Sequence, residues 1–168
     1  KTLITNKAFM KRYPILPVDI DGEIRAAYRG GWTYAKESRR GIRQGAGMVF
    51  DVNSLYPSVM YDRALPYGMP EKTDSMPDRG LWVGSVTFTG KLKDGYLPCI
   101  QIKKSMIFSD SEYVTDIPEP VTLLVTNVDW KLWTEHYDIT VLAWNWFYTF
   151  KAAKGLFVTY IDKWMRVK

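Results

Sequence analysis

The chain contains few of the residues that stabilise small secreted or zinc-binding domains. Its 168 residues include one cysteine, Cys99, and one histidine, His136. A single cysteine cannot form an internal disulfide and fits a reducing compartment, so we expect a cytoplasmic protein. A single histidine argues against a Cys/His zinc site. No apolar run approaches the roughly 20 residues of a membrane-spanning helix, so we expect no membrane partner.

Hydrophobic residues are plentiful and the charge is uneven along the chain. The hydrophobic content of 46% and the aromatic content of 15% predict a folded chain. Residues 1–47 contain 10 Lys and Arg against 4 Asp and Glu, a net charge of +6, whereas residues 48–168 contain 13 against 14, a net charge of −1. The basic N-terminal segment fits a polyanionic partner or an ordinary solvated surface, and charge alone does not separate the two.

Periodicity and turn residues predict an α+β fold whose first part contains a strand–helix unit. Turn residues interrupt the N-terminal region, and Gly30-Gly31 precedes a flexible basic stretch. The prediction is an irregular region over 1–22, a short strand over 23–28, a strand over 48–53, a helix over 54–63 and a turn-rich exit over 65–70.

The following part of the chain reads as a mainly β insertion with one short helix. Strands are predicted over 81–88, 97–102, 121–126 and 139–150, with Pro118 and Pro120 in a loop and a terminal helix beginning near Leu156. Asn127 or Asp129 is expected to cap a helix over about 128–136. A domain of this size needs aromatic volume in its core, so the core is expected to contain Trp130, Trp133, Trp144, Trp146 and Phe147.

Asp51 follows the apolar run Met48-Val49-Phe50 and immediately precedes the predicted helix. Ser54 is a good N-cap residue, and Pro57 is tolerated within a first helical turn. A carboxylate that can hold Mg²⁺ therefore lies beside free backbone N–H groups that can hold phosphate oxygens. A metal-bound nucleoside triphosphate requires both features. Asp51 taken alone is better explained as a helix-flanking or ion-paired aspartate.

The residues around Asp51 match a known sequence motif. The segment Asp51-Val52-Asn53-Ser54-Leu55-Tyr56-Pro57 resembles motif A of the family B DNA polymerases, whose core is Asp-x-x-Ser-Leu-Tyr-Pro. Upstream, Tyr28-Arg29-Gly30-Gly31 resembles the Tyr-x-Gly-Gly motif that precedes motif A in that family. Together with Leu65-Pro66-Tyr67-Gly68, the pattern is similar to the protein-primed phage replicases of the family. The resemblance covers roughly residues 24–168.

The resemblance implies roles for individual residues. Asp51 would be one of two carboxylates that bind a pair of catalytic Mg²⁺ ions, assisted by the Val52 carbonyl. The backbone N–H groups of Ser54, Leu55 and Tyr56 would hold the incoming deoxynucleoside triphosphate. The Tyr56 ring would pack under the sugar and exclude a 2′-hydroxyl. The template strand of a DNA template–primer would contact Tyr28, Arg29, Gly30 and Gly31.

The resemblance also implies a division of the chain. Residues 1–62 would form a basic segment and part of the polymerase palm, 63–155 an insertion that contacts the priming (terminal) protein, and 156–168 the start of a helix returning to the palm. Within the insertion, Lys103 and Lys104 are candidates for contact with DNA phosphates or the priming protein, although a solvated hairpin end explains them equally well.

Two motifs of the resembled family do not occur in this sequence. One is the Lys- and Tyr-bearing motif B, and the other is motif C, which supplies the second metal-binding carboxylate. The sequence is therefore expected to be a piece of a longer polymerase chain that does not polymerise DNA in isolation. The alternative is a standalone, non-catalytic module that binds DNA or the priming protein.

Overall fold

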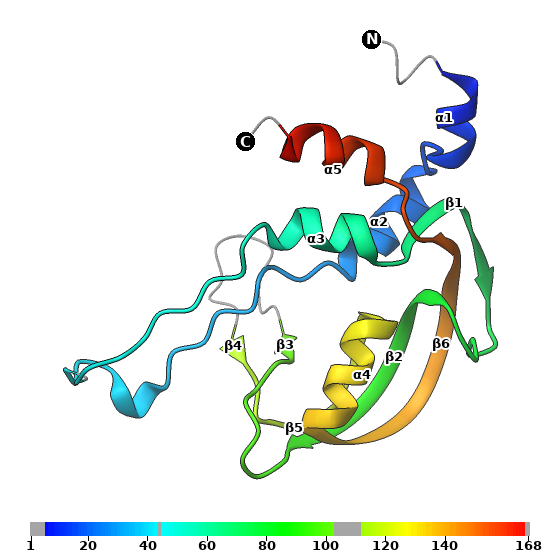
Figure 1. Cartoon of the computed structure of the whole chain (residues 1–168). Helices are drawn as coiled ribbons and strands as arrows, with labels where there is room; N and C mark the ends of the chain where they lie inside the picture. Colours follow the sequence, from blue (N-terminus) through cyan, green and yellow to red (C-terminus); the bar gives the residue numbers. More distant parts are fainter. Residues whose placement is uncertain (1–5, 44, 103–111, 167–168) are drawn as a thin grey trace. The chain divides into compact units, whose positions relative to one another are not determined.

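The computed structural model describes residues 6–43, 45–102 and 112–166 (Figure 1). Helices and strands both contribute, which confirms the predicted α+β class. The chain divides into two compact units: unit 1 contains Lys1–Tyr28 and Pro66–Ala152, and unit 2 contains Arg29–Leu65 and Ala153–Lys168. The elements in chain order are α1 (Lys7–Arg12), α2 (Val18–Ala26), η1 (Glu37–Arg39), α3 (Leu55–Asp62), β1 (Leu65–Thr73), β2 (Leu81–Leu92), β3 (Gln101–Ile102), β4 (Glu112–Tyr113), β5 (Asp116–Thr126), α4 (Asn127–His136), β6 (Tyr137–Ala153) and α5 (Val158–Met165).

A four-stranded sheet in the order β1-β6-β2-β5 forms the centre of unit 1. Strand β2 pairs antiparallel with both β5 and β6, so that Phe88 lies opposite Val121 on one side and Val141 on the other. The sheet is strongly curved, and α4 lies within its concave side (Figure 1). Strands β3 and β4 form a separate two-stranded ribbon.

Aromatic side chains fill the space between the sheet and α4. The Phe88 ring lies 5.8 Å from Trp133 and 6.4 Å from Trp130, measured between ring centroids. Trp144 lies 4.8 Å from Trp130 and 4.9 Å from Phe147. These contacts confirm the predicted core role of Trp130, Trp133, Trp144 and Phe147. Trp146 is outside this cluster: it is half-buried and lies beside Tyr148.

Tyr137, at the start of β6, connects the sheet to the segment before β3. Its side chain is 1% exposed. The hydroxyl accepts hydrogen bonds from the backbone N–H groups of Cys99 (3.0 Å) and Ile100 (3.3 Å) and donates to the Val114 carbonyl (2.7 Å). Since every polar capacity of this buried phenol is used, it holds three backbone segments together.

Unit 2 has much less buried surface. Helices α3 and α5 pack against each other, and Ile161 of α5 is the one buried hydrophobic residue among the residues of this unit that are described. From Arg29 the chain is extended, reverses direction at η1 and leads back to α3 (Figure 1). The unit therefore consists of the helices α3 and α5 and a long extended segment, called the extended excursion below, that is interrupted by η1.

The N-terminal region differs from the prediction. Instead of an irregular region over 1–22 and a strand over 23–28, the structure has helices α1 and α2. The Asn6 side chain caps α1 by accepting from Ala8 N (3.0 Å) and Phe9 N (3.2 Å). Pro17 directly precedes α2, whose first turn carries Asp19 and Asp21. Pro17 thus marks a helix start, where the missing N–H costs nothing.

Residues 48–53 do not form the predicted strand. Met48, Val49 and Phe50 are extended, but no strand pairs with them in the described part of the chain, and their side chains are 82%, 97% and 84% exposed. A short apolar run forms a strand only where another strand supplies hydrogen bonds. The helix predicted over 54–63 is confirmed as α3.

Several predicted loops and caps also require correction, although the strands predicted over 81–88, 121–126 and 139–150 and the helix near 128–136 are confirmed. The expected turns at 65–70 and at Pro118 and Pro120 belong to β1 and β5, the two edge strands of the sheet, where a residue without an N–H is tolerated. Only Gln101–Ile102 is a strand in the segment 97–102, and Thr126 caps α4 by accepting from Asp129 N (3.1 Å).

No helix in the described ranges is long and apolar enough to cross a membrane.

Candidate functional site

Asp51 lies in extended chain shortly before α3, with an exposed side chain. The first hydrogen bond of the helix runs from Ser58 N to Ser54 O (2.9 Å). Pro57 has no N–H, so Leu55 and Tyr56 carry the first-turn N–H groups that no carbonyl of the helix can accept. Asp51 therefore lies four residues before Leu55, the first of the two residues with unused N–H donors.

Ser54 has a backbone conformation that the sequence did not indicate. Its φ of 53° and ψ of 43° lie in the left-handed region, and it is the one non-glycine residue with positive φ among the described residues. Its side chain makes no capping hydrogen bond, so the predicted N-cap role of the hydroxyl is wrong. A left-handed residue followed by helical residues turns consecutive N–H groups toward one point, which is the geometry of an anion-binding nest.

The side chains around this turn are accessible. Val52 is 62% exposed, Leu55 51% and Tyr56 81%. On the side facing α5, a hollow of about 470 Å³ is lined by residues of the two helices and the preceding turn, among them Asn53, Ser54, Pro57, Ile161, Asp162 and Met165. Because a sequence pattern does not show which helices pack together, this contribution of α5 was missed.

The Tyr28-to-Gly31 segment lies at the boundary of the two units, with Tyr28 in unit 1 and Arg29 in unit 2. Tyr28 is held by a hydrogen bond from its N–H to Arg25 O (2.9 Å), next to the buried Ala27, while its side chain is 74% exposed. A Cβ added to Gly30 or Gly31 would meet nothing within 4 Å. Both glycines thus leave their backbone open to a ligand.

A second polar cluster, in unit 1, was not predicted from the sequence. The buried Tyr148 hydroxyl donates to Glu23 Oε2 of α2 (2.5 Å), and Lys72 Nζ lies 3.4 Å from the same oxygen. Burial, and then the Glu23 carboxylate, raise the pKa of Tyr148, so the phenol stays protonated and can donate. Lys72 Nζ also lies 4.8 Å from the Trp146 ring centroid. This clasp fixes α2 to the sheet only a few residues before Tyr28.

Two candidate chemistries can be assessed from the described residues. Burial, and then the charge of Asp129, raise the pKa of Cys99 to about 11, so the thiol is protonated at neutral pH and is a poor nucleophile.

Three or more potential metal ligands do not come together anywhere in the ranges described. Asp51 and the Val52 carbonyl offer the oxygen donors that Mg²⁺ prefers, whereas a two-metal site requires further carboxylates. Lys103 and Lys104 lie outside the described residues.

The sequence matches one known protein family over nearly its whole length. The profile of the family described as "DNA polymerase type B, organellar and viral" matches residues 3–168. The chain therefore belongs to the type B DNA polymerase family.

Individual relatives narrow the assignment to phage enzymes. The chain is similar to the DNA polymerase of Bacillus phage Nf (44% identity over 176 residues, 100% of this chain) and of Bacillus phage phi29 (42% over 173 residues, also 100%). It is also similar to the DNA polymerase of Streptococcus phage Cp-1, with 31% identity over 149 residues, 82% of this chain and 26% of the relative. The chain spans about 30% of the length of the Nf and phi29 polymerases.

The structure agrees with a solved relative over nearly all of its length. It superposes on phi29 DNA polymerase in complex with primer-template DNA and incoming nucleotide substrates with a TM-score of 0.88, at 41% identity, covering 98% of this chain and 30% of that one. An orthorhombic crystal form of the same polymerase gives a TM-score of 0.87. The chain thus has the fold of one part of a phage DNA polymerase.

Proposed function

We propose that this chain is the part of a protein-primed, DNA-directed DNA polymerase that supplies half of the catalytic metal site and binds the incoming nucleotide. In the proposed reaction a 3′-hydroxyl, or a hydroxyl of the priming protein, attacks the α-phosphate of a deoxynucleoside triphosphate. The observation that carries the proposal is the junction of the exposed Asp51 carboxylate with the left-handed turn at Ser54, in a chain of this family.

Asp51 and the Val52 carbonyl are the proposed Mg²⁺ ligands of this chain. Mg²⁺ ions would neutralise charge on the triphosphate and activate the attacking hydroxyl. A two-metal site requires further carboxylates, and no second acidic residue lies between Val52 and Tyr61. Asp51 by itself is therefore insufficient for catalysis, and the proposed activity belongs to a polymerase that contains this segment.

The backbone of Ser54, Leu55 and Tyr56 is the proposed triphosphate site. The unused N–H groups of the first turn and the nest geometry at Ser54 both favour an anion. The exposed Tyr56 ring, on the first turn of the helix, is proposed to pack against the sugar of the nucleotide and to exclude a 2′-hydroxyl. Asp51 lies three residues before Ser54 in the extended chain that leads into this turn, and it would help to bind the phosphates through the metal.

The Tyr28-to-Gly31 segment is the proposed template contact. The exposed Tyr28 ring can pack on a sugar or base, and the open backbone at Gly30 and Gly31 allows a phosphate to approach closely. Arg29 is proposed to add a phosphate contact. The clasp between Glu23, Lys72 and Tyr148 supports this role, since it holds the helix that leads into Tyr28.

The functional division is proposed to follow the sequence motifs: palm over 1–62, priming-protein insertion over 63–155 and a returning helix over 156–168. Lys103 and Lys104 are the proposed insertion residues for contact with DNA phosphates or the priming protein. If the enzyme replicates phage DNA, it works in the cytoplasm of the host cell, and that localisation is part of the proposal.

A chimeric polymerase tests this function. The chain would replace the matching segment of phi29 DNA polymerase, and primer extension would be measured with Mg²⁺ and all four deoxynucleotides. We expect extension by the chimera and none by the isolated chain. Asp51→Asn in the chimera should reduce the rate on the order of 1000-fold or more, because a metal ligand is lost.

The matched control is Asp62→Asn, which removes the same charge at the other end of α3. Its extension rate is expected to stay within about threefold of the unmodified chimera, because a surface substitution away from the site has little effect. Equal activity of the Asp51→Asn and Asp62→Asn chimeras would contradict the proposal, and so would robust extension by the isolated chain.

A further inference from the structure

The extended excursion of unit 2 carries a concentration of positive charge that the proposed catalytic turn does not use. We define the basic arm as residues 32–43. It contains Lys36, Arg39, Arg40 and Arg43 against one acidic residue, Glu37. The four cations lie within eight consecutive residues, and their side chains are exposed. A charge cluster of this density favours a polyanion.

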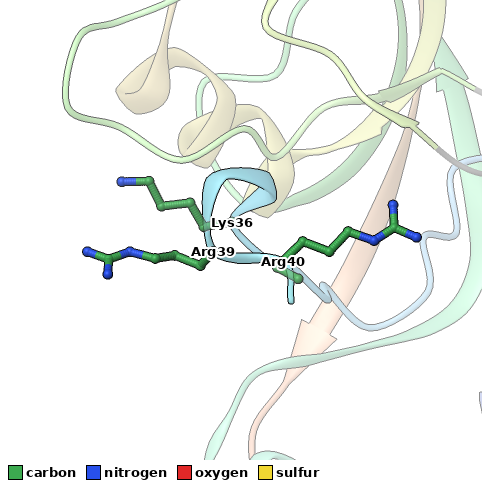
Figure 2. A pocket seen from close by; sticks show the side chains of 4 residues that line it. Lys36, Arg39 and Arg40 are labelled. Atoms are coloured by element: carbon green, nitrogen blue, oxygen red, sulfur yellow. The ribbon is translucent and has the colours of Figure 1, made fainter. Parts of the chain in front are cut away.

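The backbone of the basic arm gathers three of these cations around a hollow. The turn is closed by hydrogen bonds from Arg39 N to Lys36 O (2.9 Å) and from Ile42 N to Arg39 O (3.2 Å), and Gly41 continues it with a φ of 73°. Ala35, Lys36, Arg39 and Arg40 line a hollow of about 380 Å³. Lys36 and Arg39 extend from one side of the turn and Arg40 from the other (Figure 2).

Two lysines of unit 1 have a different environment. Lys72 lies beside the Glu23 carboxylate, and Lys93 Nζ donates to the carbonyls of Thr134 (2.9 Å) and Glu135 (3.0 Å). These charges are therefore partly neutralised by their surroundings. In the basic arm, Lys36 has no ion-pair partner among the residues described, and the surplus of cations over acids is three.

Two aromatic residues precede the cations in the same extended segment. The rings of Trp32 and Tyr34 stack on each other with a centroid distance of 5.6 Å and an interplanar angle of 13°. They remain 49% and 41% exposed, so the pair presents an accessible flat surface. Aromatic faces beside cations are typical of sites for single-stranded nucleic acid, where bases stack on rings and phosphates meet the charges.

We propose that the basic arm is a binding site for single-stranded DNA, separate from the Tyr28-to-Gly31 contact. Lys36, Arg39 and Arg40 bind the phosphates of the strand, and the Trp32–Tyr34 pair stacks against its bases. This inference rests on the proposed function, because unit 2 would meet a single-stranded template if the chain is part of a DNA polymerase. The basic arm contacts the phosphates and the faces of the bases, which are present in every DNA sequence. Binding is therefore independent of the sequence of the DNA strand.

Salt dependence of binding tests the phosphate contacts. A fluorescein-labelled oligothymidylate would be titrated with the isolated chain, and anisotropy would be followed over a range of NaCl concentrations. Removing three phosphate contacts, in the variant K36A/R39A/R40A, should lower the slope of log K against log [salt] by about 2 for a single strand. The same change corresponds to a loss of affinity on the order of 100-fold at 0.1 M salt.

The matched control removes three exposed lysines of unit 1, in the variant K91A/K131A/K151A. It has the same net charge as the arm variant, so we expect its salt slope and affinity to stay close to those of the unmodified chain. Circular dichroism would verify that each variant is folded. An equal loss in both variants, or no binding by the unmodified chain, would overturn the inference.

The aromatic contacts are tested separately by the variant W32A/Y34A. Its affinity for the oligothymidylate should fall by about tenfold while the salt slope stays unchanged, since stacking involves no phosphate. Unchanged affinity, or equally tight binding of duplex DNA by the unmodified chain, would overturn the assignment to a single strand. Neither outcome affects the Asp51 result in the chimera, so failure of the arm and failure of the proposed function are distinguishable.

Discussion

The two units of this chain differ in how they are stabilised. Twelve of the thirteen buried hydrophobic residues in the described part of the chain belong to unit 1, and Ile161 is the contribution of unit 2. Unit 1 therefore has a core of its own, whereas unit 2 leaves Met48, Val49 and Phe50 between 82% and 97% exposed. Unit 2, which contains the segment around Asp51, is thus the less well packed of the two, and unit 1 provides most of the buried core.

The largest expected difference comes from removing one phenylalanine ring in each unit. Phe147→Ala should lower the free energy of unfolding by about 4 kcal/mol, because the ring is fully buried between Trp82 and Trp144. Phe50→Ala should change it by less than about 0.5 kcal/mol, since that ring is 84% exposed. Urea denaturation followed by tryptophan fluorescence measures both. Similar values for the two variants would show that unit 2 has packing comparable to that of unit 1.

The next effect concerns a single hydroxyl group. Tyr137→Phe should destabilise the chain by about 3 kcal/mol, because the Cys99 and Ile100 N–H groups and the Val114 carbonyl lose their buried partner. Tyr160→Phe, in α5 of unit 2, removes the same group from a side chain that is 56% exposed and should have little effect. Thermal unfolding followed by circular dichroism compares them, and equal melting temperatures would contradict the hydrogen-bond assignment.

The smallest expected effect on stability comes from replacing one of two glycines of unit 1 with alanine. A Cβ at Gly84 would lie 2.8 Å from Phe147 Cδ1, so Gly84→Ala should cost about 1–3 kcal/mol through overpacking. Gly22 lies in α2, where a Cβ would meet nothing within 4 Å, and Gly22→Ala should stabilise by about 0.5–1 kcal/mol. Differential scanning calorimetry would record melting temperatures that move in opposite directions. Shifts of the same sign would show that Phe147 can move away from Gly84.

Local sequence patterns correctly predicted those elements of unit 1 that pack against neighbouring elements of the same unit. Strand β2, strand β6 and α4 were located because their apolar pattern matches the partners they find nearby. The strand expected over 48–53 failed for the opposite reason: its apolar residues find no neighbouring strand in the described residues. Periodicity reports a tendency to be buried, and it does not report whether the burying partner is present.

The candidate site was predictable in its residues but not in its backbone. The sequence identified Asp51 and the turn from Ser54 to Tyr56, because the residue types suit a metal and a phosphate. It gave no sign that Ser54 adopts a positive φ, since that conformation is far more common for glycine or asparagine. Long-range pairs such as Glu23 with Tyr148 were also out of reach, because 125 residues separate them in the sequence.

The prolines of the two outer strands affect how the chain behaves when many copies are present. β1 contains Pro66 and Pro70, and β5 contains Pro118 and Pro120, so each outer strand of the four-stranded sheet lacks two backbone N–H donors. Growth of this sheet by recruitment of strands from other molecules is therefore disfavoured. The segment Met48–Phe50, apolar and unpaired within the described chain, has no such protection and is where intermolecular strand pairing would begin.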